Sequence, residues 1–120
     1  MAIHNERGKF GEKLAEEYLI NHGYKVLLTN WYAKRYEVDI IAQKNNILVF
    51  CEVKYRSSSL FGEPEFFVTK RKQKNIIQSA AFYVGQTCWQ GELRFDIISV
   101  LKENETIKIN HIEDAFGCTW

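Results

Sequence analysis

The chain lacks the features that mark several protein classes. Its three cysteines are odd in number and have no C-x-x-C spacing, which excludes a disulfide framework and a zinc ribbon. Its three histidines are scattered and form no H-x-x-x-H pair. No apolar run approaches the roughly 18 residues that a membrane span needs, and the N-terminal MAIHNERGKFGEK has no apolar signal segment. We therefore expect a soluble, cytoplasmic, unprocessed protein with reduced thiols and no membrane partner.

A strong charge of one sign is also absent. Sixteen Lys and Arg against fifteen Asp and Glu give a formal charge of +1, which excludes a histone-like polycation and an acidic tail protein. This near-neutral total does not exclude a basic face on one part of the surface. The chain has one proline, Pro64, and no repeat, while 46% hydrophobic and 14% aromatic residues suffice for one core. A length of 120 residues predicts a single domain over 1–120.

Hydrophobic spacing and turn residues predict an alternation of helices and strands. Helices are expected over 6–22, before Gly23, and over 70–84, with Thr69 as N-cap and Gly85 as the end. Strands are expected over 24–31, 37–43, 47–54, 93–101 and 106–112, with a long loop over 55–68. The order α-β-β-β-α-β-β predicts an α/β sandwich with a mixed sheet, in which the second helix is a crossover to a parallel strand.

The central hairpin carries the strongest chemical signal. With a turn at Asn45-Asn46, paired positions sum to 91, which sets Asp39 directly opposite Glu52 and Glu37 opposite Lys54. Like charges opposed across a sheet destabilise it, whereas two converging carboxylates suit a divalent cation. Lys54 on the same face would reach a metal-bound water or a phosphate oxygen. This face should also carry Ile41, Leu48 and Phe50, and the other face Val38, Ile40, Val49, Cys51 and Val53.

Structural explanations of the same residues stay open. Glu37 and Lys54 could form a cross-strand ion pair, and a nearby cation could neutralise Asp39. Glu12 borders the apolar stripe of the first helix, where a plain helix-flank acid would also fit. Asp96 lies in the apolar segment LRFDIISVL, where a buried charge needs a partner, so we expect it to pair with a basic residue.

A basic segment follows the hairpin. Residues 54–74 contain six basic residues against Glu63 and Glu65. The candidate nucleic-acid-binding residues are Arg56, Lys70, Arg71, Lys72, Gln73 and Lys74. Several cations at a helix N-terminus oppose the helix dipole, which favours an anion-binding role such as contact with a phosphodiester backbone. A solvated helix face is the alternative.

The pattern E-x-D-I-I … V-F-x-E-V-K-x-R resembles the PD-(D/E)xK motif of the restriction-endonuclease-like superfamily. The whole chain looks like the YraN-like family of predicted endonucleases, which is distantly similar to archaeal Holliday junction resolvases. The specific segments are G-x-x-G-E-x-x-A-x-x-Y-L at 8–19 and L-V-F-C-E-V-K-Y-R at 48–56. The resemblance implies a restriction-endonuclease-like sandwich with a central antiparallel hairpin flanked by helices.

The resemblance also implies residue roles. It assigns Asp39 and Glu52 as catalytic metal ligands, Lys54 as the catalytic motif lysine, and Glu12 as an additional metal-binding acid on a helix. Gln73 matches a helix position near such sites. Glu37 stands where the motif name has proline, and we take it as an accessory residue. The implied cofactor is Mg²⁺ or Mn²⁺.

These features together predict a metal-dependent endonuclease that hydrolyses phosphodiester bonds in DNA, with branched or structured DNA as candidate substrates. The alternatives are a non-catalytic nucleic-acid-binding module on a nuclease fold and a structural interaction protein with an incidental E-x-K strand. A junction-cleaving enzyme needs two active sites, so a homodimer also stays open.

Overall fold

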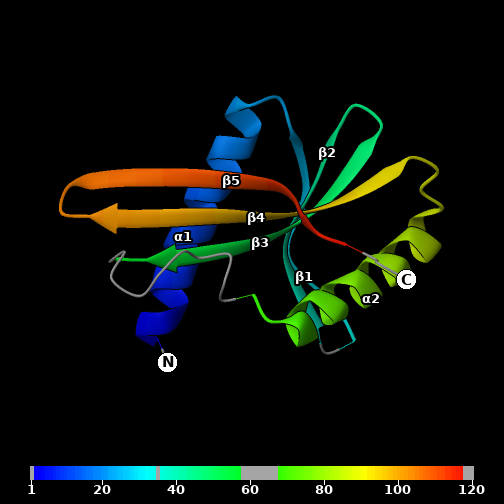
Figure 1. The fold of residues 1–120 in the computed structure, drawn as a ribbon, viewed down its shortest axis with the longest axis horizontal. Helices are drawn as coiled ribbons and strands as arrows, with labels where there is room; N and C mark the ends of the chain where they lie inside the picture. The colour runs from blue at the N-terminus through cyan, green and yellow to red at the C-terminus, as the bar shows by residue number, and fades with distance from the viewer. Residues whose placement is uncertain (1, 35, 58–67, 118–120) are drawn as a thin grey trace.

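Helices and strands follow one another in the predicted order (Figure 1). The computed structural model describes residues 2–34, 36–57 and 68–117, with the side chains of the first helix from residue 8 onward. The elements are α1 (Ala2–Asn21), β1 (Lys25–Ala33), β2 (Tyr36–Lys44), β3 (Ile47–Arg56), α2 (Lys70–Thr87), β4 (Glu92–Glu103) and β5 (Thr106–Phe116).

The strands form one mixed sheet in the order β1-β2-β3-β4-β5. Neighbouring strands are antiparallel except β3 and β4, which run parallel. Because α2 connects these two strands, it supplies the crossover that a parallel pair requires. The prediction of an α/β fold with a mixed sheet and a helical crossover is therefore confirmed.

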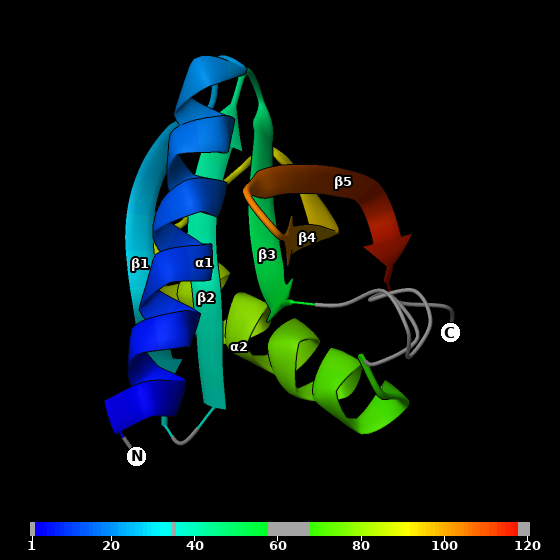
Figure 2. The ribbon, with the colours of Figure 1, turned by 90° about the vertical axis from the view of Figure 1, so that its left-hand side faces the viewer.

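The two helices cover opposite faces of the sheet, and Figures 1 and 2 show the sheet between them. Under α1, Ala15 and Leu19 are fully buried against a cluster that includes Ile40, Ala42, Val49, Cys51, Ile98 and Val100. Under α2, Ile76 and Ala80 pack against a cluster that includes Val38, Ile41, Leu48, Phe50 and Phe95. Burial of these two apolar layers is the main source of stability.

Several predicted element ends are wrong, and the last strand continues to Phe116 instead of ending at residue 112. α1 begins at Ala2 rather than at residue 6, and β3 continues through Arg56, where a loop was expected. Most of the expected loop, residues 58–67, lies outside the described residues. α2 passes Gly85 and ends at Thr87, because Cys88 adopts a left-handed conformation (φ 57°) and donates its N–H to the Val84 carbonyl at 2.8 Å.

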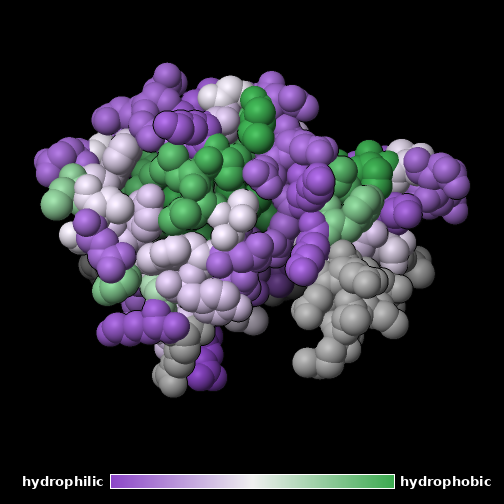
Figure 3. Space-filling model, turned by 180° about the vertical axis from the view of Figure 1, so that it is seen from behind, coloured by the Kyte–Doolittle hydropathy of each residue, from purple (hydrophilic) through white to green (hydrophobic). Residues whose placement is uncertain are grey.

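The back of the molecule shows an apolar patch beside hydrophilic side chains (Figure 3). The large hydrophobic side chains that stay exposed include Ile20, Leu28, Tyr32, Phe82, Leu93 and Ile107. Folded proteins commonly leave part of their apolar surface exposed. Among the described residues, no helix combines the length and apolarity that crossing a membrane would take.

Candidate functional site

The predicted register of the β2–β3 hairpin holds only up to the Ile40–Cys51 pair. Asp39 and Glu52 are not paired across the strands as expected. The Asp39 carboxylate instead accepts a hydrogen bond from the backbone N–H of Val53 at 2.8 Å. The Val53 N–H is therefore bonded to a side-chain oxygen and not to a backbone carbonyl of β2. The regular pairing of β2 and β3 ends just before the two acids.

This parting of the strands also changes which face some residues occupy. Ile41 and Phe50 lie under α2, and Ile40 and Cys51 lie under α1, so the two pairs occupy opposite faces as predicted. Val38 was expected on the same face as Ile40, but it packs in the cluster under α2. The strict alternation of a regular strand fails between Val38 and Ile40, next to Asp39.

Asp39 and Glu52 are both buried, with exposed fractions of 8% and 2%. Burial, followed by the negative charge of Glu52, raises the pKa of Asp39 to about 8. One carboxylate oxygen of Glu52, Oε1, is buried and has no hydrogen-bond donor among the described residues while both acids are ionised, and a hydrogen bond between the two side chains adds to the raised pKa of Asp39. A buried carboxylate with an unused oxygen needs a partner, which makes this pair a candidate functional site.

Two lysines supply positive charge to Glu52. Lys54 Nζ lies 3.6 Å from Glu52 Oε2, and Lys72 Nζ, which reaches in from α2, lies 2.5 Å from the same oxygen. Within the described residues Lys54 has no ion pair with Glu37, so that structural explanation of Lys54 is not realised. The expected motif lysine is therefore at the site, together with a lysine that we had expected on the nucleic-acid surface.

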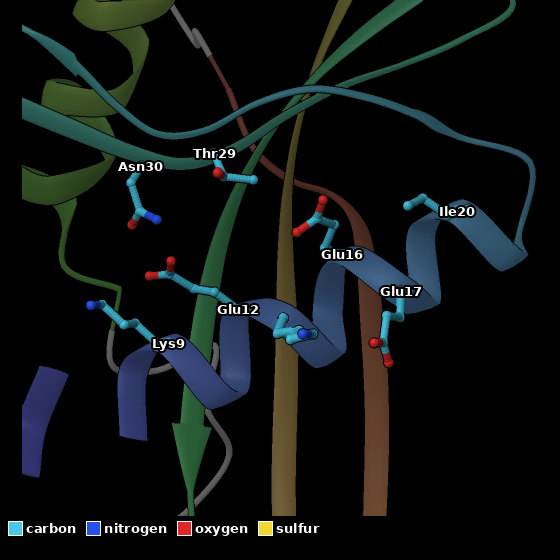
Figure 4. A pocket seen from close by; sticks show the side chains of 8 residues that line it. Lys9, Glu12, Glu16, Glu17, Ile20, Thr29 and Asn30 are labelled. Atoms are coloured by element: carbon cyan, nitrogen blue, oxygen red, sulfur yellow. The ribbon is translucent and has the colours of Figure 1, made fainter. Parts of the chain in front are cut away.

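Glu12 borders the site from α1. It is partly buried, and burial raises its pKa, while a hydrogen bond with the Asn30 side chain opposes the rise. Figure 4 shows its carboxylate pointing toward Asn30 across a groove of about 430 Å³ between α1 and β1. Gly11 lets the helix approach β3 at this level, because a Cβ on Gly11 would meet the Cβ of Tyr55 at 2.7 Å.

Glu37 adds a further acid at the edge of the site. Burial and then the charge of Glu52 raise the pKa of Glu37, while the Lys72 ammonium lowers it. Glu12, Glu37, Asp39 and Glu52 thus influence one another electrostatically, as the sequence predicted for acids gathered at one place.

The predicted nucleic-acid-binding residues differ in how they are placed. Lys70, Arg71 and Lys74 are exposed, as a binding surface requires. The Gln73 side chain instead donates a hydrogen bond to the Val68 carbonyl at 3.1 Å, just before the helix. The last member of the predicted set, Arg56, is the final residue of β3 and is partly buried.

The donors suit a divalent cation held by two carboxylates. In the part of the chain that the structure describes, no three His, Cys, Asp or Glu side chains form a ready-made metal site, so the predicted three-acid set of Glu12, Asp39 and Glu52 is not preassembled. Mg²⁺ is commonly held by one or two carboxylates, together with waters and substrate phosphates. The unused Oε1 of Glu52 and the adjacent Asp39 meet that requirement.

Asp96 lies apart from this site in a separate polar network. It is completely buried, and Arg94 donates two hydrogen bonds to its carboxylate, at 2.9 and 2.8 Å. His111 Nε2 lies 2.6 Å from Asp96 Oδ2, and the backbone N–H of Asp114 donates to Oδ1 at 3.0 Å. The prediction that Asp96 pairs with a basic residue is confirmed.

Comparison with known proteins places relatives of the chain among bacteria. Residues 11–100 match the model of the "Uncharacterised protein family UPF0102". The chain is 51% identical to a UPF0102 protein of Flavobacterium psychrophilum, over 97% of this chain and 98% of that protein. It is 45% identical to a UPF0102 protein of Bacteroides thetaiotaomicron, over 97% and 96% of the two chains. A UPF0102 protein of Syntrophomonas wolfei is 42% identical over 95% of this chain and all of its own length.

Proposed function

The chain belongs to the uncharacterised protein family UPF0102, as its YraN-like resemblance predicted, and we propose that it is a metal-dependent nuclease that hydrolyses phosphodiester bonds in DNA. One observation carries the proposal. A buried pair of acids, Asp39 and Glu52, has an unused carboxylate oxygen and lies beside two lysines. Oxygen ligands next to ammonium groups are what a phosphoryl-transfer site requires.

The proposal includes the restriction-endonuclease-like fold and the PD-(D/E)xK motif. Asp39 on β2 and the Glu52-x-Lys54 segment on β3 occupy neighbouring antiparallel strands. β3 continues into a helical crossover and a parallel strand, so the acids lie near the middle of a mixed sheet flanked by helices. This arrangement supports the motif assignment that the resemblance implies.

Asp39 and Glu52 would hold a divalent cation, and Glu12, whose charge acts on both, would be an additional ligand. When bound, such a cation supplies a Lewis acid for the scissile phosphate and lowers the pKa of a coordinated water. Lys54 would orient the attacking water or stabilise negative charge that develops on the phosphate oxygens. Because Asp39 and Glu52 are buried, their charges act in a medium that screens them weakly.

The exposed start of α2 supports a nucleic-acid substrate. Lys70, Arg71 and Lys74 lie on the same helical turns as Lys72, which contacts Glu52. A phosphodiester chain that crosses these cations would therefore pass close to the acid pair. Contacts of this kind position a nucleic acid without reading its sequence, so we propose that the protein selects DNA by shape.

A panel of duplex, flap, branched and single-stranded DNA and RNA, incubated with Mn²⁺ or Mg²⁺, tests the proposal. Wild type should cut at least one DNA form, and Glu52→Gln, which preserves size but removes the charge, should reduce cutting to background. Lys54→Met should slow cutting by about 100-fold or more. Glu105→Gln, an exposed acid in the β4–β5 turn, serves as the control and should cut like wild type.

The same panel separates the competing function. Wild type that binds DNA without cutting any form, and whose thermal stability is unchanged by millimolar Mn²⁺, would identify a non-catalytic binding module. Absent or salt-insensitive nucleic-acid binding would reject both functions, because contacts with phosphates weaken as salt rises.

A further inference from the structure

Lys72 occupies an unusual position for a residue in a basic surface segment. Its Nζ lies 2.5 Å from Glu52 Oε2, while its side chain remains 44% exposed. Lys72 precedes Ile76 by four residues and Ala80 by eight, so helical spacing sets it on the face of α2 that packs on the sheet. The ion pair is thus fixed by the docking of the helix rather than by a chance meeting of surface side chains.

The partner of Lys72 is the most enclosed acid of the site. Glu52 is 2% exposed, and an isolated charge at that depth is strongly unfavourable. Lys54, at 3.6 Å, is farther from the Glu52 carboxylate than Lys72 is. In the protein without metal, Lys72 therefore provides the principal compensation for the Glu52 charge.

A divalent cation and the Lys72 ammonium need the same carboxylate. An ammonium 2.5 Å from Oε2 repels a metal ion on Glu52 and takes one of the two oxygens that the ion could use. The buried side of the carboxylate is different, since Oε1 has no hydrogen-bond partner in the described parts of the chain. Lys72 thus occupies Oε2 of Glu52 and leaves Oε1 available to a metal ion.

We propose that Lys72 is an internal counter-ion that competes with the metal for Glu52 and lowers the metal affinity of the site. This inference rests on the proposed function, because it concerns the cation that the acid pair would bind. Lys72 has two effects in this scheme: it stabilises the metal-free fold, and it must move away from Glu52 when the metal binds. Its half-exposed side chain has solvent to move into.

Calorimetric titration of Mn²⁺ into wild type, Lys72→Met and Lys74→Met tests the competition. Methionine preserves an unbranched apolar stem and removes the charge. Lys72→Met should bind Mn²⁺ at least about tenfold more tightly than wild type. Lys74→Met removes an exposed charge from the same helical turn and should stay within about twofold of wild type.

Thermal unfolding with EDTA gives a readout that needs no nuclease activity. Lys72→Met should unfold at a lower temperature than wild type in EDTA, because Glu52 loses the nearer of its two lysines. Saturating Mn²⁺ should raise its unfolding temperature by more than it raises that of wild type. Lys72→Arg preserves the charge and should bind Mn²⁺ no more tightly than wild type. If Lys72→Met does not fold, Lys72→Gln replaces it with the same expectations.

The outcomes distinguish this inference from the proposed function. If wild type binds Mn²⁺ and Lys72→Met binds it equally or more weakly, Lys72 supports metal binding instead of competing, and the inference fails while the function stands. If neither wild type nor Lys72→Met nor Lys72→Gln binds Mn²⁺, the metal-dependent function itself fails.

Discussion

Replacing Asp96 with asparagine tests how the chain stabilises a buried charge away from the candidate site. The Asp96 carboxylate accepts two hydrogen bonds from Arg94, contacts His111 Nε2 at 2.6 Å and accepts the backbone N–H of Asp114. Asparagine has nearly the same shape, but its NH₂ group would face donors instead of accepting from them. Arg94, whose side chain is only 17% exposed, would keep only its longer ion pair with the exposed Glu113, at 3.7 Å.

The magnitude follows from these contacts. Removing one partner of a buried ion pair costs about 3–5 kcal/mol, because the remaining charge loses its main compensation. Glu113 compensates Arg94 only weakly, because it is exposed and lies 3.7 Å away. Since a domain is stable by only about 5–15 kcal/mol, Asp96→Asn should lose a large part of its free energy of unfolding. The midpoint of thermal unfolding should fall by roughly 10–20 °C.

Urea titration followed by circular dichroism measures this loss. Asp114→Asn is a matched control, because it removes the same formal charge from an exposed neighbour and asparagine tolerates the positive φ of 54° there. The control should stay within about 0.5 kcal/mol of wild type. A loss below about 1 kcal/mol in Asp96→Asn would refute the stabilising role of the network.

The pH dependence of unfolding gives an independent check that the ionised Asp96 carboxylate stabilises the fold. Burial alone would raise the pKa of Asp96, but hydrogen bonds from His111 and Arg94 outweigh it and hold that pKa below its ordinary value of 3.8. A carboxyl group whose pKa is lowered in the folded state stabilises the fold at pH values above its ordinary pKa. This stabilisation is lost as the pH falls through the lowered pKa. The difference between wild type and Asp96→Asn should therefore be full at pH 7 and shrink only below about pH 4.

The remaining predictions concern the metal and the approach of α1. Because the pKa of Asp39 is raised to about 8, Mn²⁺ must displace a proton at lower pH. Calorimetry should therefore show affinity rising from about pH 6.5 to 8 and levelling off above, whereas a flat profile would contradict the assignment of Asp39 as a ligand. Gly11→Ala should destabilise the fold by about 1–3 kcal/mol in urea titrations, since its Cβ would meet Tyr55 at 2.7 Å. Gly8→Ala has nothing within 4 Å and should instead gain up to about 1 kcal/mol; equal effects of the two changes would contradict the close helix approach.

Much of the fold was predictable because local signals agreed with one another. The Asn45-Asn46 turn fixed the hairpin register, and the helix between the third and fourth predicted strands allowed a parallel crossover. Helix ends were less predictable. Gly85 was expected to stop α2, but the left-handed cap falls at Cys88, where a non-glycine residue adopts positive φ through a contact that sequence patterns do not reveal.

The site was predictable in its residues but not in its geometry. Asp39, Glu52 and Lys54 come together as predicted, but not through the predicted pairing, which ends at Ile40–Cys51. Where the strands part, Asp39 accepts a hydrogen bond from the backbone N–H of Val53, which no periodicity shows. Lys72 was predicted on the nucleic-acid surface, and its contact with Glu52 was missed although a signal existed, because its spacing from Ile76 places it on the apolar face of the second helix.

Two buried acids in the same sheet show opposite solutions to one physical problem. Asp96 has every carboxylate oxygen bonded to groups of the chain, and its pKa is lowered. Glu52 is as deeply buried, yet one oxygen has no hydrogen-bond partner in the described segments, and its nearest cation comes from the half-exposed Lys72. A chain that satisfies Asp96 so completely can satisfy a buried carboxylate when stability alone is at stake. At neutral pH a proton on Asp39, shared with Glu52, completes the pairing, and in the function that we propose a bound cation would replace that proton.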